Sequence, residues 1–181
     1  MVMEVNIENI VSAITLDKEI NLKDFTSKAR GLEYNPDRFP GAVFRIKEPK
    51  LAMLIFSSGK VICTGAKSME EIEIGVENLI KKLEEADIKI EKEPIVEVQN
   101  IVASAKMDVN VNLDTLAMEC ENTEYEPEQF PGLVFQLDEP KTVMLVFRSG
   151  KIIITGAKTP EDARIAAEKT KKKIEEVGAV I

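Results

Sequence analysis

The sequence predicts an α+β fold made of two similar repeats in tandem. Sliding the 181-residue chain against itself by 91 positions aligns its halves without a gap, and a fixed period is the sign of a repeated structural unit. Each copy shows the same order of patterns: a β-rich segment, a short helix, closely spaced strands and a long helix. We therefore expect residues 1–91 and 92–181 to fold alike within one rigidly fused protein.

Three motifs recur in both copies. Asn9-Ile-Val11 recurs at 100–102, and Tyr34-x-Pro-x-x-Phe-Pro-Gly41 recurs at 125–132. The third motif is Ser58-Gly-Lys60 with Thr64-Gly-Ala-Lys67, which recurs at 149–151 and 155–158. Two such copies give a protein approximate twofold symmetry, which favours a ligand that is itself roughly twofold.

Each repeat is expected to open with a long strand and a short helix. In the first copy, residues 4–16 are rich in Ile and Val, the composition of a strand. Asn21 then caps a helix over residues 22–30, which Gly31 ends. The segment 34–41 is rich in turn residues and is expected to be a loop.

Antiparallel strands and a long helix are expected to complete each repeat. Glu48-Pro49 and Ser57-Ser58-Gly59 separate short apolar runs, which we interpret as strands at 42–47, 51–56 and 60–65. Ser68 and Glu71 form a capping box at the start of the helix. Its apolar stripe at helical spacing consists of Ile72, Val76, Leu79, Ile80 and Leu83. In the second copy, Pro160 takes the favoured first position of the equivalent helix, after Thr159.

Composition excludes several classes of protein. With 44% hydrophobic and 31% charged residues, the chain is expected to be globular with a sizeable core. No apolar run approaches a membrane span and the start does not resemble a signal peptide, so a cytoplasmic protein is expected. Cys63 and Cys120 correspond to Ile154 and Ala29 of the other copy. These apolar counterparts predict two buried cysteines instead of a disulfide or a metal pair. Because histidine is also absent, no zinc site is expected.

An enzyme is an alternative class, and the sequence argues against it. The segment from Gly59 to Lys67 does not have the G-x-x-x-x-G-K-[ST] spacing of a phosphate-binding loop. No histidine is available as a general base. Neither catalysis nor a cofactor is therefore expected.

The strands are more apolar than a sheet covered on one side should be. The runs 51–56, 61–63 and 142–147 are apolar on both faces, whereas a half-covered sheet should alternate. Period-two alternation would place on one surface Asn9, Val11, Leu54, Phe56, Ile62 and Thr64, continued by Asn100, Val102, Leu145, Phe147, Ile153 and Thr155. This area exceeds what a monomer usually exposes, and either a homodimer or sandwich core or another partner could cover it.

The motifs, in this order in both halves, resemble those of the TATA-box-binding protein family. The signatures are Tyr-x-Pro-x-x-Phe-Pro-Gly, Glu-Pro-Lys, Phe-x-Ser-Gly-Lys and Thr-Gly-Ala-Lys, and the resemblance covers about residues 4–181. The acidic composition and the lack of an additional N-terminal region make the chain similar to the archaeal form. The resemblance implies a saddle: a curved ten-stranded antiparallel sheet with DNA on its concave side and four helices on its convex face.

A role in transcription initiation is what the resemblance implies. Such a protein would bind the TATA box of double-stranded promoter DNA in the minor groove and recruit transcription factor B and, through it, RNA polymerase. This family is itself the known example of a minor-groove binder that inserts apolar wedges. By matching position, the intercalating pairs are Phe39 with Phe56 and Phe130 with Phe147. The groove contacts are Asn9, Val11, Leu54, Ile62, Thr64, Asn100, Val102, Pro131, Leu145, Ile153 and Thr155.

Asn9 and Asn100 are polar residues in apolar strands, and a buried amide needs hydrogen-bond partners. The resemblance supplies base acceptors at the centre of the site; capping or bridging strands within the protein is the alternative. Close apolar contact requires that no guanine amino group stands in the groove, which explains a preference for A/T-rich DNA.

The charge of the whole chain opposes DNA binding. Its net charge is −8 and its pI is near 4.8, so phosphates should repel it. The local distribution of charge matters more, because basic residues lie on or beside the expected strands whereas many acids lie in the helices or turns. We therefore expect a local basic rim around the apolar face. The resemblance implies phosphate contacts by Arg38, Arg45, Ser58, Lys60, Lys67, Ser149, Lys151 and Lys158. The family has an arginine where this chain has Gln136, so the chain departs there from the family pattern of phosphate contacts.

The two repeats differ mainly in charge. Where the first copy has Arg30, Asn35, Arg38, Arg45 and Lys47, the second has Glu121, Glu126, Gln129, Gln136 and Asp138. Acidic residues beside a DNA-inserting loop make poor phosphate contacts. The resemblance implies instead a docking patch for transcription factor B at Glu124, Glu126 and Glu128.

A symmetric protein-interaction scaffold, or a homodimer that buries the apolar face, is the alternative function. The apolar face could also self-associate when DNA is absent. Binding to an A/T-rich duplex, compared with a G/C-rich control, separates these functions.

Overall fold

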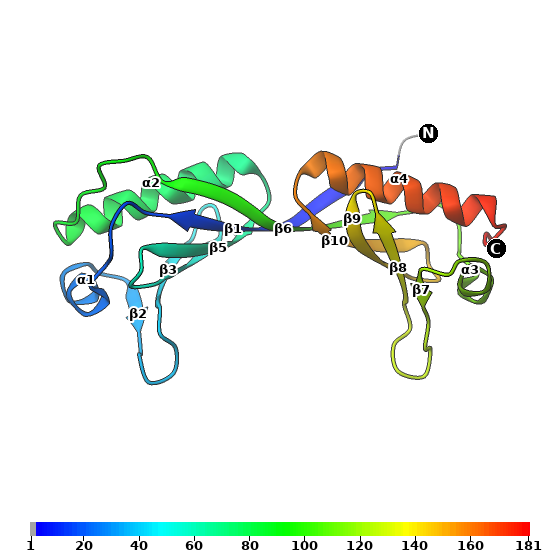
Figure 1. The fold of residues 1–181 in the computed structure, drawn as a ribbon, viewed down its shortest axis with the longest axis horizontal. Helices are drawn as coiled ribbons and strands as arrows, with labels where there is room; N and C mark the ends of the chain where they lie inside the picture. Colours follow the sequence, from blue (N-terminus) through cyan, green and yellow to red (C-terminus); the bar gives the residue numbers. More distant parts are fainter. Residues whose placement is uncertain (1–2) are drawn as a thin grey trace. The chain divides into compact units, whose positions relative to one another are not determined.

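The structure, a computed structural model, describes residues 3–181 (Figure 1). These residues form ten strands and four helices, and the sheet has the strand order β2-β3-β4-β5-β1-β6-β10-β9-β8-β7. The predicted α+β class, with an antiparallel ten-stranded sheet and four helices, is confirmed.

The chain divides into two compact units. The first unit is Asn9–Gln99, and the second unit combines the residues through Glu8 with Asn100–Ile181. The units follow packing, whereas the predicted repeats follow sequence, so the boundary between residues 91 and 92 stays a prediction.

The elements follow the same order in both halves of the chain. The first half contains β1 (Val5–Thr15), α1 (Leu22–Lys28), β2 (Leu32–Tyr34), β3 (Ala42–Ile46), β4 (Leu51–Ile55), β5 (Lys60–Ala66) and α2 (Met69–Glu85). The second half contains β6 (Ile95–Lys106), α3 (Leu113–Glu119), β7 (Thr123–Glu124), β8 (Leu133–Asp138), β9 (Lys141–Val146), β10 (Lys151–Ala157) and α4 (Pro160–Glu176).

Local interpretation of the sequence missed two short strands. β2 pairs with β3 over only three residues, Leu32 to Tyr34, and β7 pairs with β8 over two. Segments this short are too brief for a period of two to be recognised. The predicted helix 22–30 was also too long: Ala29 adopts an extended conformation while its N–H bonds to the carbonyl of Phe25. The helix therefore ends at Lys28.

Helix capping follows the sequence closely. Asn21 accepts a hydrogen bond from the N–H of Asp24, and Ser68 accepts one from the N–H of Glu71 at 3.2 Å. The Glu71 carboxylate reaches the N–H of Lys67, one residue before the cap, at 2.9 Å. The bonds to the N–H groups of Asp24 and Glu71 satisfy donors that a helix start would leave unpaired.

The long helix α2 packs on one face of the sheet at very short range. A Cβ atom at Gly75 would lie 2.8 Å from the flexible side-chain ends of Leu51 and of Met53, so any larger residue there would have to displace both side chains. Ala166, fully buried, takes the corresponding position in α4. The core of each unit therefore lies between its long helix and one face of its strands.

Both cysteines are free and buried, as predicted. Burial raises the pKa of the Cys63 and Cys120 thiols above the ordinary value, so both stay protonated near neutral pH. No helix in the part of the chain that the structure describes has the length and apolar composition needed to cross a membrane.

Candidate nucleic-acid interface

One face of the strands in each unit is apolar yet only half-buried. In β4 and β5 of the first unit, Met53, Ile55, Val61 and Cys63 are completely buried. The residues between them alternate to the opposite face and stay half-buried, and Leu54 pairs directly with Ile62. The helices thus cover one face and leave the other open to a ligand.

The second unit repeats this arrangement. Leu145 of β9 pairs with Ile153 of β10, and Val143 pairs with Thr155. Within each unit, the structure thus places the predicted residues of one sheet surface together, all of them half-buried. In the first unit these residues are Asn9, Val11, Leu54, Phe56, Ile62 and Thr64; in the second they are Asn100, Val102, Leu145, Phe147, Ile153 and Thr155.

Asn9 bridges β1 and β5 through both ends of its side-chain amide. Its oxygen accepts a 2.6 Å hydrogen bond from the N–H of Gly65, and its nitrogen donates to the Thr64 hydroxyl at 3.1 Å. Gly65 has φ +104°, a conformation open to glycine, and it lies where the register between β1 and β5 shifts. Asn9 therefore satisfies an N–H that the irregular strand pairing leaves free.

Asn100 makes the same bonds in the second unit. Its oxygen accepts from the N–H of Gly156 at 2.6 Å, and its nitrogen donates to Thr155 at 3.1 Å. The strand-bridging alternative for these asparagines is therefore what the protein itself shows. Because each amide nitrogen carries two hydrogens, one donor stays available on the half-buried face.

Two phenylalanine pairs stand at corresponding places in the units. The rings of Phe39 and Phe56 lie 5.6 Å apart, edge to face, and those of Phe130 and Phe147 lie 5.8 Å apart. Edge-to-face contact at this distance is favourable for aromatic rings. Phe130 remains 41% exposed.

A glycine beneath each pair makes room for the two rings. A Cβ atom on Gly41 would lie 2.9 Å from the Phe39 ring and 3.2 Å from the Phe56 ring. On Gly132 it would lie 2.7 Å from Phe130 and 3.0 Å from Phe147. In the sequence these glycines read only as turn residues, although their fixed place two residues after Phe39 and Phe130 was a signal of this role.

Turn geometry positions the second phenylalanine of each pair. The N–H of Gly59 donates to the carbonyl of Phe56, and the N–H of Phe56 donates to the carbonyl of Lys60. Phe147 makes the corresponding bonds with Gly150 and Lys151. Each ring is thus held at a tight strand connection instead of on a flexible loop.

Basic and hydroxyl residues are mostly exposed near these elements. Arg45 forms an exposed ion pair with Glu33 at 3.1 Å, which contributes little to stability. Ser58 and Ser149 each accept a long hydrogen bond of 3.4 Å from the N–H two residues later. The remaining cationic candidates are exposed, namely Arg38, Lys60, Lys67, Lys151 and Lys158.

The acidic candidates surround the loop that carries Phe130. The carbonyl of Glu126 accepts from the N–H groups of Gln129 and Phe130, which fixes the turn. Within residues 3–181, the side chains of Glu124, Glu126 and Glu128 form no ion pair or hydrogen bond, and all three are exposed. They are available to a cationic partner.

Sequence analysis missed some residues of the half-buried face. Val43 pairs with Leu54, and Val134 pairs with Leu145, in both cases on that face. Alternation in the strand 42–47 already contained this signal. Ser104 also lies half-buried on this face, and its hydroxyl donates to Glu8 at 2.8 Å; no motif marked it.

The fold and this surface define an α+β protein of two tandem repeats, each of which presents an apolar, half-buried sheet face with an asparagine and a pair of phenylalanines in edge-to-face contact. Residues 4–86 and 95–177 match the family described as transcription factor TFIID, or TATA-binding protein. The chain belongs to the TATA-binding protein family, in its archaeal form, a family of transcription factors and not of enzymes.

Individual relatives match over nearly their full length. The chain is 48% identical to the TATA-box-binding protein of Archaeoglobus fulgidus, over 97% of both chains. It is 46% identical to that of Methanothermobacter thermautotrophicus, over 98% of both. The solved structure of the Methanococcus jannaschii protein superposes with a TM-score of 0.88 at 48% identity, covering 96% of this chain and 99% of that one.

Proposed function

We propose that this protein binds the TATA element of promoter DNA through the minor groove, bends it, and recruits transcription factor B and then RNA polymerase. The observation that carries the proposal is the half-buried apolar face with its two phenylalanine pairs. Relatives that are nearly half identical bear the name TATA-box-binding protein. On this proposal, the protein acts at the nucleoid.

The phenylalanine pairs act as wedges. An apolar ring inserted between base steps offsets part of the cost of unstacking them and kinks the duplex. Phe39 and Phe56 would kink one end of the element, and Phe130 and Phe147 the other. The glycines beneath them leave room for both rings of each pair.

The half-buried faces contact the floor of the groove. Val11, Leu54, Ile62, Val102, Leu145 and Ile153, with Pro131, would press on bases and sugars, which excludes base pairs that carry a guanine amino group. Asn9 and Asn100, beside Thr64 and Thr155, would donate their remaining N–H groups to base acceptors.

Cationic side chains and hydroxyl groups at the edges would contact phosphates. They are Arg38, Arg45, Ser58, Lys60, Lys67, Ser149, Lys151 and Lys158. Each contact releases counterions, so affinity should fall as salt rises. The net charge of −8 keeps nonspecific binding weak.

The acidic loop of the second unit supplies polarity. Two similar repeats cannot by themselves distinguish the two directions of a near-palindromic element. The side chains of Glu124, Glu126 and Glu128 have no partner among residues 3–181 and would bind a basic surface of transcription factor B, with RNA polymerase joining through that factor.

Truncation of the wedges tests the proposal. Phe56→Ala and Phe147→Ala should weaken binding to a TATA duplex and reduce its bend, measured by energy transfer between dyes at the DNA ends. Met118→Ala, which shortens an 84% exposed side chain, is the control and should change neither. Wild-type affinity and bend in both phenylalanine variants would refute the wedge assignment.

The same apolar face gives the DNA-free protein a route to self-association. Sedimentation should show larger species at high concentration that dissociate when a TATA duplex is added. A protein-interaction scaffold would instead show equal affinity for A/T-rich and G/C-rich duplexes.

A further inference from the structure

A second apolar surface lies on α2, within the first unit. A groove of about 570 Å³ opens between α2 and the segment that leads into β6. It is lined by Met69, Ile72, Glu73, Val76, Glu77, Ile80, Glu93, Pro94 and Val96. Because α2 packs on the covered face of the strands, this groove is separate from the proposed DNA contacts of the same unit.

The groove combines an apolar floor with an acidic rim. Val76 and Ile80 belong to the apolar stripe of this helix, yet both are only half-buried. Met69 and Val96 are 42% and 37% exposed. The rim carboxylates Glu73, Glu77 and Glu93 are exposed and form no ion pair or hydrogen bond within residues 3–181.

The second repeat shows that the fold does not require this groove. At the positions of Ile72, Val76 and Ile80, offset by 91, stand Ala163, Ala167 and Lys171. Arg164 replaces Glu73, and the carboxylate of Glu168, which corresponds to Glu77, is bonded to the N–H of Met3. The apolar floor and the unpaired acids are thus specific to the first repeat.

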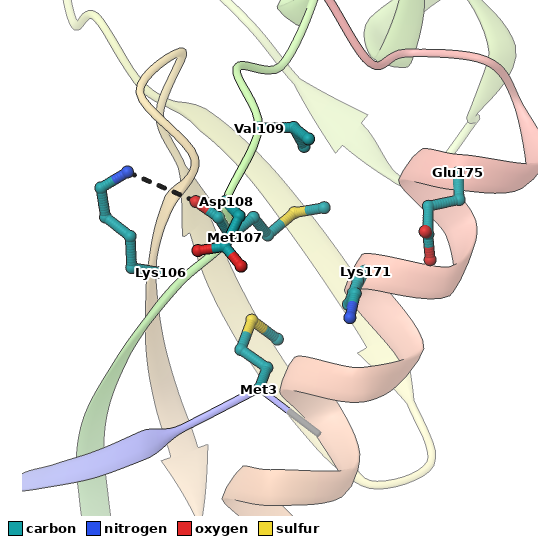
Figure 2. A pocket seen from close by; sticks show the side chains of 7 residues that line it. All are labelled: Met3, Lys106, Met107, Asp108, Val109, Lys171 and Glu175. Carbon is teal, nitrogen blue, oxygen red and sulfur yellow. Dashed lines mark hydrogen bonds between the residues drawn. The ribbon is translucent and has the colours of Figure 1, made fainter. Parts of the chain in front are cut away.

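Figure 2 shows what lies beside α4 instead. The pocket there measures only about 210 Å³, and its lining mixes opposite charges. It is lined by Met3, Lys106, Met107, Asp108, Val109, Lys171 and Glu175. Lys106 donates to the carbonyl of Met107 at 3.3 Å. A mixed surface of this size offers neither a continuous apolar floor nor a single sign of charge.

We propose that the α2 groove binds a basic amphipathic helix of a protein partner. Apolar residues at helical spacing on such a segment would fill the floor, which is the usual mode of helix-in-groove recognition. Its lysines or arginines would pair with the rim carboxylates. Nucleic acids and anionic membranes carry the same sign of charge as the rim and are disfavoured. From Met69 to Ile80 the groove spans about 16 Å of helix, which matches a partner segment of about three turns.

A synthetic peptide tests the proposal on the full-length, DNA-free protein. The probe is a fluorescent helix of about 18 residues with leucines at i, i+3, i+4 and i+7 and lysines elsewhere. One control peptide has the same composition with leucines spread around the helix, and another has glutamate in place of lysine. Fluorescence anisotropy should show saturable binding of the probe only.

Two pairs of matched variants locate the binding. Glu73→Lys with Glu77→Lys should weaken the affinity for the probe peptide by about tenfold or more. Glu84→Lys with Glu119→Lys, an equal change of charge elsewhere, should change that affinity by no more than about twofold. Ile80→Ser should weaken binding, and Ile74→Ser, on the same helix outside the groove, should not. Binding to a TATA duplex confirms that each variant is folded.

Three results would overturn the proposal. They are equal binding of the spread-leucine peptide, equal loss in both charge variants, and sedimentation showing that Ile80→Ser converts a dimer into a monomer. The last result would mean that a second copy of the chain covers the groove. The phenylalanine variants do not touch α2. Failure of the probe peptide to bind would therefore leave the proposed DNA function standing, and wild-type DNA binding by the phenylalanine variants would leave the groove proposal standing.

Discussion

The backbone N–H of Gly65 fixes which end of the Asn9 amide faces outward. The bond to the Asn9 oxygen is 2.6 Å long, and the corresponding bond from Gly156 to Asn100 has the same length. With the oxygen held by the protein, only N–H groups remain to meet a ligand. Since A·T pairs present only acceptors in the minor groove, this orientation suits A/T-rich DNA before any contact is made.

Replacing either asparagine with aspartate tests that orientation. Asn9→Asp or Asn100→Asp can still accept the glycine N–H, so the fold should persist, but the donor is lost and a charge faces base acceptors. Affinity for a TATA duplex should fall by roughly 1–3 kcal/mol, more than in Lys60→Ala. Gel-shift titrations measure the difference; wild-type affinity in the aspartate variants would show that these amides do not contact bases.

Filling the space beneath a phenylalanine pair should displace its rings. In Gly41→Ala the new methyl would stand 2.9 Å from the Phe39 ring, so the DNA bend should decrease while the protein stays folded. Adding Phe39→Leu provides a double-mutant cycle. If the ring is the obstacle, the two substitutions are non-additive in their effect on affinity; strict additivity would mean that Gly41 acts through the backbone alone.

Exchanging the residues at one pair of corresponding positions in the two repeats tests how a buried hydroxyl affects stability. Ser12 is fully buried, and its hydroxyl has no hydrogen-bond partner among residues 3–181. The neighbouring Cys63 thiol opposite it in β5 is at best a weak partner. Ala103, which corresponds to Ser12, is also buried. Ser12→Ala should therefore stabilise the protein by about 1 kcal/mol, and Ala103→Ser should destabilise it.

Thermal and urea denaturation of the two variants measures these changes. An unchanged stability in Ser12→Ala would mean that the Cys63 sulfur satisfies the hydroxyl after all.

Charge reversal in the acidic loop should separate DNA binding from partner binding. Glu126→Arg with Glu128→Arg should keep or strengthen TATA binding and abolish the complex with transcription factor B, because like charges then face each other. Asn35→Arg with Asp37→Arg, at the corresponding positions of the first repeat, is the control. If transcription factor B supershifts the DNA complex of the Glu126→Arg, Glu128→Arg variant at the concentration that suffices for the wild-type protein, this docking patch is ruled out.

The sequence predicted those features that rest on local rules. Caps at Asn21 and Ser68 and alternation in β4 and β5 follow from short-range chemistry, and the structure agrees. It did not predict β2, because the alternation of Leu32, Glu33 and Tyr34 is too short to distinguish a strand from a loop until β3 pairs with it. Nor did it show that Val76 and Ile80 line a groove, since an apolar stripe does not reveal which of its members a neighbour covers.

The candidate site also contains residues that a local pattern predicts and residues that it does not. Alternation alone placed the residues of β1, β4 and β5 on one face, but no period applies to Phe39 and Phe130, which lie in turns. Only the resemblance to a family assigned them a role. The contact of their rings with Phe56 and Phe147 arises from the folding of distant segments.

The division of the chain into units has a consequence for its history. The start of β1, through Glu8, belongs with the second unit, and Ile95–Gln99 of β6 belong with the first. Cutting the gene between codons 91 and 92 would take strand residues away from both units at once. A single-repeat protein made from either half would have to replace the strand residues that the other half now supplies, so the duplication has become hard to reverse.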